Sequence, residues 1–243
     1  MHFHLPKPLH GWREFLGEVG IIVVGVLIAL GAEQIVESFH WRGEVEAERR
    51  SLLQEARDTL DGVALRRRQQ SCVDHRLDEI RTALERHRRG EAVSLSGRIG
   101  YPAVLSASRG SWQIALAGQA LSHMDHDERL AFSDVFGTFD LWDSLREQER
   151  QTWYRLSMLN TPELLTEQDW GSAASAYNEA RMRNEHLRLL APFVLGKRLP
   201  GLGDYQATPE DLSAFRHMAA EICQPVLATT PTPPPAQARQ PHS

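Results

Sequence analysis

At 243 residues the chain is long enough for one large domain or two small ones. A formal net charge of −5 argues against a dedicated nucleic-acid-binding protein, which normally carries a clear basic excess, so we expect no nucleic-acid partner. Two cysteines are too few for a disulfide scaffold. Leu, Ala, Glu, Arg and Gln are frequent, and β-branched residues are sparse outside one apolar run. This composition favours helices, and we predict an all-α fold.

The apolar run lies near the N-terminus and predicts a membrane-spanning helix. Its uncharged core, Val19 to Ala32, has 14 residues, which as a helix is about 21 Å long and shorter than a bilayer core of about 30 Å. The longer segment from Phe15 to Val36 reaches about 33 Å and has its charges near the ends. We therefore predict a flexible arm over 1–14 and a transmembrane signal anchor over 15–37.

Aromatic residues flank this segment at both ends. Trp12 and Trp41 are about 43 Å apart along a helix, close to the separation of about 40–45 Å between the two interfacial zones of a bilayer. Because Trp prefers these zones, we assign Trp12 and Phe15 to one membrane interface and Phe39 and Trp41 to the other. The lipid bilayer is thus the first expected partner.

Two other interpretations of the run remain open. Ala29-Leu-Gly31 is an acceptable cleavage site for a signal peptide, but Glu14 and Glu18 precede the core, where a signal peptide carries positive charge. A buried core helix fits less well, because the run is apolar on all faces. Gly25 and Ala29 have the spacing that lets two spans approach closely, although both residues are common in spans. We favour the second explanation of this pair, and we name a second copy of the chain or another envelope protein as the further candidate partner.

The residues Arg13-Glu-Phe-Leu-Gly-Glu-Val-Gly-Ile-Ile-Val-Val-Gly-Val-Leu-Ile-Ala-Leu-Gly-Ala-Glu-Gln-Ile-Val-Glu37 carry a resemblance. This stretch resembles the N-terminal anchor of a group of uncharacterised bacterial single-pass membrane proteins, which are domains of unknown function. The resemblance covers about 25 residues well and the remainder loosely. It implies a bacterial membrane protein with a helical domain, and we predict that this membrane is the inner one. It implies no activity, and no functional residue can be transferred from it.

The charges beside the span barely decide its orientation. Lys7 and Arg13 precede it, whereas Arg42, Arg49 and Arg50 follow it, which is nearly a tie under the positive-inside rule. The N-terminal arm is very short, as in an uncleaved signal anchor whose N-terminus stays inside. We therefore predict a cytoplasmic N-terminus and a periplasmic domain.

The two cysteines, Cys72 and Cys223, both follow the span. A bridge between them would tie the start of the domain to its end and would suit an oxidising compartment. Two buried free thiols are the alternative, because free Cys is often buried.

A helical-bundle domain is predicted over 38–224, and a stalk helix that continues the span is expected to begin it. Apolar residues recur in steps of three and four at Val45, Leu52, Leu53, Ala56, Leu60, Val63 and Ala64, and again from Val73 to Leu84. The polar patch 66–71 predicts a bend or break between the two runs. Its triple arginine, Arg66 to Arg68, suits anionic lipid or phosphate, but a solvated helix face is the simpler interpretation.

Further helices are expected after a Gly-, Ser- and Pro-containing loop at 91–109. The first begins near Ser111, and the second runs from Leu130 to Leu159 and carries an aromatic stripe. The third begins at Thr166, and the last begins at Thr208 and ends near Cys223. The aromatic stripe indicates core packing rather than a cofactor site. A disordered Pro-rich tail is predicted over 225–243.

The nearest approach to a metal-ligand cluster is the group His123, Asp125, His126 and Asp127. Helix capping explains its acidic residues more simply, and transition-metal sites usually take ligands from several elements.

No nucleophile elbow, zinc-protease helix, phosphate loop or dinucleotide motif occurs in the chain. We therefore assign no catalytic residue and no cofactor, and expect a non-enzymatic interaction, sensing or scaffold domain. A metal-binding or enzymatic domain using residues 123–127 is the alternative.

Overall fold

The structure, a computed structural model, describes residues 11–104, 109–203, 205 and 221–227 of the chain. The named elements in this part are α1 (Trp12–Arg68), α2 (Gln70–Arg88), α3 (Gly110–Ala117), α4 (Ala120–His123), α5 (His126–Leu156), the 3-10 helices η1 (Ser157–Asn160) and η2 (Pro162–Leu164), and α6 (Glu167–Leu195). The predicted all-α fold, with an apolar N-terminal helix leading into a helical domain, is confirmed.

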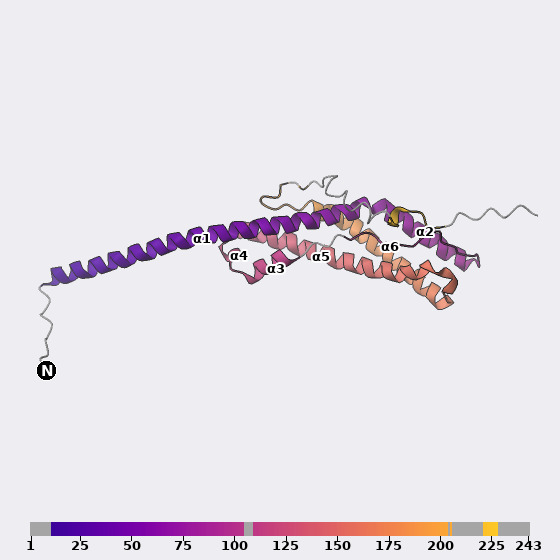
Figure 1. The fold of residues 1–243 in the computed structure, drawn as a ribbon, viewed down its shortest axis with the longest axis horizontal. Helices are drawn as coiled ribbons and strands as arrows, with labels where there is room; N and C mark the ends of the chain where they lie inside the picture. Colours follow the sequence, from indigo (N-terminus) through magenta and orange to yellow (C-terminus); the bar gives the residue numbers. More distant parts are fainter. Residues whose placement is uncertain (1–10, 105–108, 204, 206–220, 228–243) are drawn as a thin grey trace, which may run out of the picture.

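Helix α1 is continuous over 57 residues, and its sequence contains no proline to interrupt the backbone hydrogen bonds. Its N-terminal half projects from the domain, as Figure 1 shows. A segment of α1 that starts at Phe15 is long and apolar enough to cross a membrane, and none of its apolar window is buried. Val45 is the first buried residue along α1. The predicted continuity between the apolar segment and the stalk is therefore present in the structure.

Three rods of helix form the described part of the domain (Figure 1). The second half of α1 and α2 lie in line as one rod, α5 runs beside them, and α6 returns in the opposite direction. Two 3-10 helices make the reversal between α5 and α6. All the predicted stripe residues of α1 are buried, and most of the aromatic stripe of α5 forms the core: Phe132, Val135, Phe136, Phe139, Trp142, Trp153 and Leu156.

Two of the predicted helix starts have the expected local chemistry. The carboxylate of Asp125 accepts hydrogen bonds from the backbone N–H groups of Asp127 and Glu128 and so caps α5. Thr166 and Asp169 form a reciprocal capping box at the start of α6. The long helix accordingly begins at His126, four residues before the predicted Leu130.

The predicted break between the two runs of the stalk lies at Gln69, between α1 and α2. The interpretation of Arg66 as part of a solvated face is wrong, because this side chain is buried. Arg67 and Arg68 are exposed as predicted. Arg66 is in register with the buried stripe, three residues after Val63, so the helix turns it toward the interior.

Short helices α3 and α4 lie against the middle of α1 (Figure 1). Trp112 of α3 is buried and stacks on Phe136 of α5, with ring centroids 4.8 Å apart. This contact fixes α3 to the aromatic part of the core. The two short helices thereby form the end of the domain nearest to the apolar segment.

The C-terminal segment 221–227, which we call the strap, returns to α2. Val226 is buried, and its carbonyl oxygen accepts a hydrogen bond of 2.8 Å from the backbone N–H of Ser96. The domain therefore extends at least to Leu227, beyond the boundary predicted at residue 225. Residues 1–10 of the predicted arm, the helix start at Thr208 and the tail after 227 lie outside the described residues.

Candidate functional site

The structure does not bring the predicted metal-ligand residues together. The ring of His123 stacks on Trp41, with centroids 4.0 Å apart, while Asp125 caps α5. The Nδ1 atom of His126 lies 3.2 Å from the guanidinium of Arg129. In the part of the chain that the structure describes, no group of three or more His, Cys, Asp or Glu residues could hold a metal ion.

Two of these residues, His123 and Asp125, line a cleft between the stalk and the domain, which we call the junction cleft. It has a volume of about 760 Å³ and is lined by residues of α1 and of the α4–α5 corner: Gln34, Glu37, Ser38, Trp41, Arg42, Val45, Glu46, Arg49, His123, Asp125 and Glu128. The α1 members recur at helical spacing, so they form one face of the stalk. The α4–α5 corner supplies the opposite wall.

An ion pair between α1 and α5 closes the end of the cleft that is farther from the apolar segment. The guanidinium of Arg49 donates hydrogen bonds of 2.5 and 2.8 Å to the two carboxylate oxygens of Glu128, and it also pairs with Glu46. The hydrogen bond with Glu128 raises the pKa of Arg49 above its ordinary value. This bidentate geometry joins the stalk to the start of α5.

The other end of the cleft carries charges with fewer partners. The indole N–H of Trp41 donates a 3.2 Å hydrogen bond to Glu37, and the guanidinium of Arg42 lies over the ring of Phe39 at 5.7 Å. Among the described residues, neither Glu37 nor Arg42 has an ion-pair partner within 4.0 Å. Of the four residues predicted at the membrane interfaces, Trp12, Phe15 and Phe39 are exposed, whereas Trp41 is half-buried against His123.

A second polar feature lies inside the bundle, at the level where α1 gives way to α2. Arg66 donates hydrogen bonds to Glu149 of α5 and to Asn184 of α6, the shortest to each being 2.7 Å. Glu149 also accepts a hydrogen bond from Arg146, and Asn184 donates to Asp74 of α2. These residues connect all three rods, and we call them the buried charge layer.

The layer separates two apolar clusters, one toward the stalk and one toward α2. Burial lowers the pKa of Arg66 to about 10 and the pKa of Arg146 to about 9. Both guanidiniums remain protonated at neutral pH, so two buried cations face one buried carboxylate. Burying these charges costs free energy, and the layer is stable only because each charge is paired.

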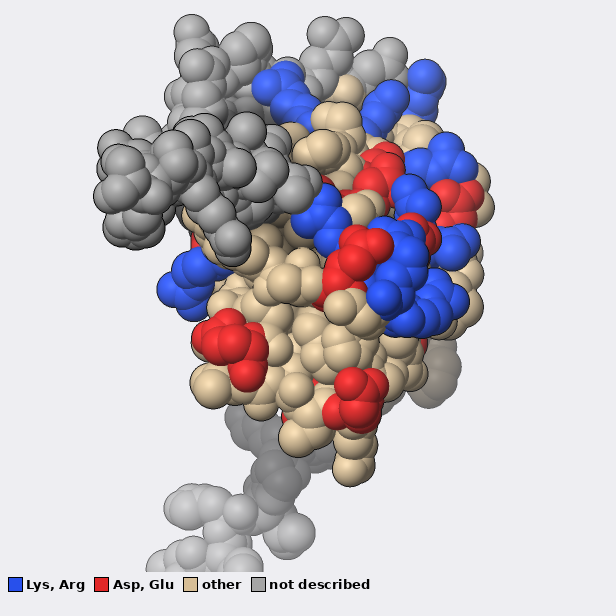
Figure 2. Space-filling model, turned by 90° about the vertical axis from the view of Figure 1, so that its right-hand side faces the viewer, with Lys and Arg blue, Asp and Glu red and all other residues tan. Residues whose placement is uncertain are grey.

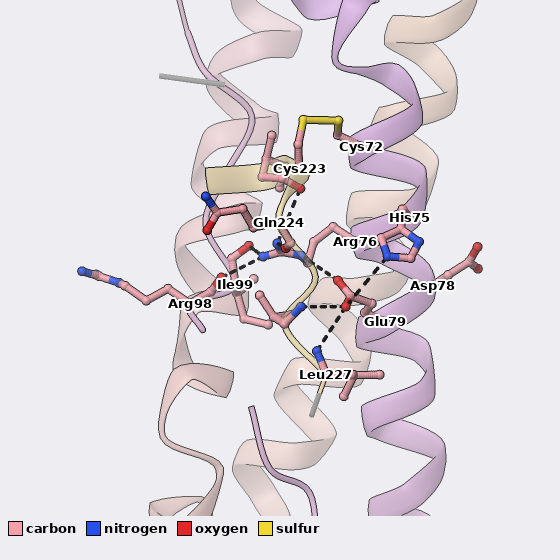
Figure 3. A network of polar contacts seen from close by, with 12 residues as sticks. Cys72, His75, Arg76, Asp78, Glu79, Arg98, Ile99, Cys223, Gln224 and Leu227 are labelled. Carbon is pink, nitrogen blue, oxygen red and sulfur yellow. Dashed lines mark hydrogen bonds and ion pairs between the residues drawn. A yellow bond between two sulfur atoms is a disulfide. The ribbon is translucent and has the colours of Figure 1, made fainter. Parts of the chain in front are cut away.

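A third polar feature holds the strap, and Figure 3 shows it. The fully buried guanidinium of Arg76 donates hydrogen bonds to the main-chain carbonyls of Arg98 at 2.8 Å and Glu221 at 3.2 Å, and also to those of Ile99 and Gln224. One side chain of α2 thereby binds two separate segments, the loop after α2 and the strap. Since a buried carbonyl without a partner is unfavourable, Arg76 makes their burial possible.

Glu79 acts beside Arg76. One oxygen of its carboxylate accepts hydrogen bonds from the backbone N–H groups of Val226, at 2.7 Å, and Leu227, at 3.1 Å. Its other oxygen accepts from Arg76 at 3.0 Å. One helical turn before this pair, a disulfide joins Cys72 to Cys223. The strap is therefore held covalently at one point and by charged hydrogen bonds at the next.

The end of the domain farthest from the apolar segment has a groove between α2 and α6. It has a volume of about 810 Å³, and in it the ring of His87 stacks on Trp170 at 4.1 Å. Figure 2 shows this end of the molecule, where Lys and Arg side chains gather on one side with acidic side chains among them. No described group in the groove has the arrangement of a catalytic site.

Most residues that make these polar contacts do not stand out among the many charged residues of the sequence. The pattern that identifies them is the helical register of the charged residues relative to the buried apolar ones. Arg76 is three residues after the buried Val73, and Glu149 is seven after the buried Trp142, so each continues a core stripe. A charged residue in core register predicts a buried pair, because an unpaired buried charge is too costly.

Comparison of the chain with models of protein families, with curated proteins and with solved structures finds no match. The resemblance of the anchor to uncharacterised bacterial membrane proteins therefore stays a prediction.

Proposed function

We propose that the chain is a single-pass protein of the bacterial inner membrane, whose helical domain acts outside the cytoplasm as an interaction, sensing or scaffold module. The observation that carries this proposal is the continuity of α1, which passes from an uncovered apolar segment into the core of the domain without a break.

Energetics support a membrane as the cover of the apolar segment. Eight large apolar side chains between residues 21 and 30 are exposed: Ile21, Ile22, Val23, Val24, Val26, Leu27, Ile28 and Leu30. Removing them from water is worth on the order of 10 kcal/mol, which is as large as the whole stability of an ordinary domain. A bilayer provides this burial along all faces of a single helix.

The disulfide supports the periplasmic side. Structural disulfides persist in oxidising compartments and are rare in the bacterial cytoplasm. The bridge between Cys72 and Cys223 lies in the domain, whereas the charges around the span leave its direction nearly balanced. A periplasmic domain on an anchor with its N-terminus inside accommodates both facts.

The domain's own features support binding rather than catalysis. Its polar contacts join helices or hold the strap, and neither cleft described above brings together a nucleophile with a base or a set of metal ligands. A stalk that continues the span into the core also provides a rigid connection, by which a change at the membrane would reach the domain.

Labelling with a membrane-impermeant thiol reagent tests the proposed topology. Cys223 is exposed, so on intact spheroplasts we expect labelling after reduction and little before it. As a matched control, Ser172→Cys on the exposed surface of α6, in a chain with Cys72 and Cys223 replaced by serine, should label without reduction. Labelling of the control only after lysis would place the domain in the cytoplasm and refute the proposal.

A helix-breaking insertion tests the role of the stalk. Gly-Gly-Pro inserted after Glu37 would interrupt α1 between the apolar segment and Val45, the first buried residue. In a deletion strain we expect the wild-type gene to complement and the insertion variant to fail while its domain stays folded. Full complementation by the insertion variant would show that the stalk only tethers the domain to the membrane and transmits nothing to it.

A further inference from the structure

The junction cleft lies at a defined height relative to the proposed span. Trp41 follows Val36, the last residue of the apolar segment, by about 7.5 Å along α1. The headgroup layer on each side of a bilayer is about 5–7 Å thick. The part of the cleft lined by Glu37 and Ser38 is therefore level with the lipid headgroups. The α4–α5 corner contacts α1 farther from the span, at Trp41 and Arg49.

The cleft carries more negative than positive charge. Four carboxylates and two guanidiniums line it. Arg49 is fully engaged by Glu46 and Glu128, which leaves Arg42 as the cation without an ion pair among the described residues. The cleft thus offers one free guanidinium and an excess of negative charge.

We propose that the junction cleft binds the headgroup of a zwitterionic phospholipid that carries a primary ammonium group, of the phosphoethanolamine class. The phosphate pairs with Arg42, and the ammonium group lies among the carboxylates that line the cleft, of which Glu37 is nearest the bilayer. This inference rests on the proposed membrane anchor.

The chemistry of the cleft selects against anionic lipids. A phosphoglycerol headgroup presents the same phosphate to Arg42 but has no cation to offset the carboxylates, so the excess negative charge repels it. An ammonium group offsets part of the excess negative charge in the low-dielectric wedge between helix and bilayer, and its three donors can reach several of the carboxylates. A volume of about 760 Å³ accommodates a headgroup of this size.

Lipid retention by the full-length protein tests the proposal. The chain is reconstituted in nanodiscs containing equal amounts of phosphatidylethanolamine and phosphatidylglycerol and is then released gently into a mass spectrometer. We expect bound phosphatidylethanolamine to exceed phosphatidylglycerol about fivefold or more, and Arg42→Ala or Glu37→Gln to reduce its retention by about tenfold, the value of one charge-assisted hydrogen bond.

Two matched controls lie on the same stretch of stalk but outside the cleft, Glu44→Gln and Arg50→Ala, both at exposed positions. We expect them to retain lipid as the wild type does. Glu37→Gln keeps an acceptor for the indole of Trp41, so its effect reports the lost charge rather than a lost contact. Circular dichroism of each variant checks that the domain remains folded.

The outcomes separate the inference from the proposed function. Equal retention of both lipids, or retention unchanged in Arg42→Ala and Glu37→Gln, overturns the headgroup site while leaving the membrane anchor intact. Retention of free phosphoethanolamine added without a bilayer, at the same level, would mean that the membrane is not the source of the ligand and would also overturn it. A chain that alkaline carbonate strips from native membranes refutes the anchor, and the headgroup site with it.

Discussion

Removing the carboxylate of Glu149 should destabilise the domain more than any other charge-removing substitution on α5. Glu149 is 1% exposed and is the acidic partner of two buried cations, Arg66 and Arg146. Glu149→Gln preserves the volume of the side chain but removes the one carboxylate to which both guanidiniums are hydrogen-bonded. Breaking a buried ion pair from one side costs about 3–5 kcal/mol, because the remaining charge stays desolvated.

The matched control lies two residues away on the same helix. Glu147 is exposed and pairs with Arg150 at 2.6 Å on the surface. Since exposed pairs contribute about 0–1 kcal/mol, Glu147→Gln should change stability by no more than about 0.5 kcal/mol. The two variants remove the same charge from the same helix, one from a buried site and one from an exposed site.

Urea unfolding of the full chain in detergent, followed by circular dichroism, measures both effects. With a denaturant slope of about 2 kcal/mol per molar, the midpoint of Glu149→Gln should fall by about 2 M, while that of Glu147→Gln stays near the wild type. A third variant with Met at 66 and Leu at 146 and 149 should recover most of the loss, because apolar replacement of a whole buried charge cluster is often neutral or stabilising. Equal midpoints for the two single variants would refute the reasoning.

Four further predictions concern the strap and a helix start. Replacing Cys72 and Cys223 by alanine should lower the unfolding free energy by about 2–5 kcal/mol, since the bridge closes a loop with a sequence separation of 151; an unchanged melting temperature in the presence and absence of reductant would contradict this. Arg76→Met should cost about 3 kcal/mol by leaving main-chain carbonyls unpaired, and limited proteolysis should then cut the strap faster than in the wild type. Thr166→Ala should cost about 1 kcal/mol through loss of the cap, which thermal unfolding would detect. Hydrogen bonds from Thr166 lower the pKa of Asp169. The contribution of this carboxylate to the free energy of unfolding should therefore be present above its unfolded pKa of about 3.9 and be lost as the pH falls through its lower folded pKa. If acid unfolding of Asp169→Asn follows the same pH profile as that of the wild type, this prediction is wrong.

Local patterns in the sequence determined the elements of this fold. Periods of three and four placed the buried stripes of α1 and α5, and cap chemistry identified Asp125 and Thr166 as capping residues. The apolar segment was evident because no other run in the chain is long and uniformly apolar. Such features depend on residues close together along the chain, so propensity and periodicity are sufficient to predict them.

Contacts between distant residues required the tertiary structure. The sequence identified His123, Asp125, His126 and Asp127 as neighbours, but the folded chain uses one to stack on Trp41 and another to cap a helix. Short sequence spacing does not make side chains converge, because a helix start points successive residues in different directions.

The same reason explains the interpretation of the triple arginine. In the sequence, Arg66, Arg67 and Arg68 are equivalent cations, yet the helix turns only Arg66 toward Glu149, which is 83 residues away. The partner that makes burial of this charge acceptable comes from another helix, and no local pattern specifies it. The sequence by itself therefore determined where the helices and the apolar segment are, whereas only the packing of three rods decided which charges are buried, how the strap is held and where the junction cleft lies.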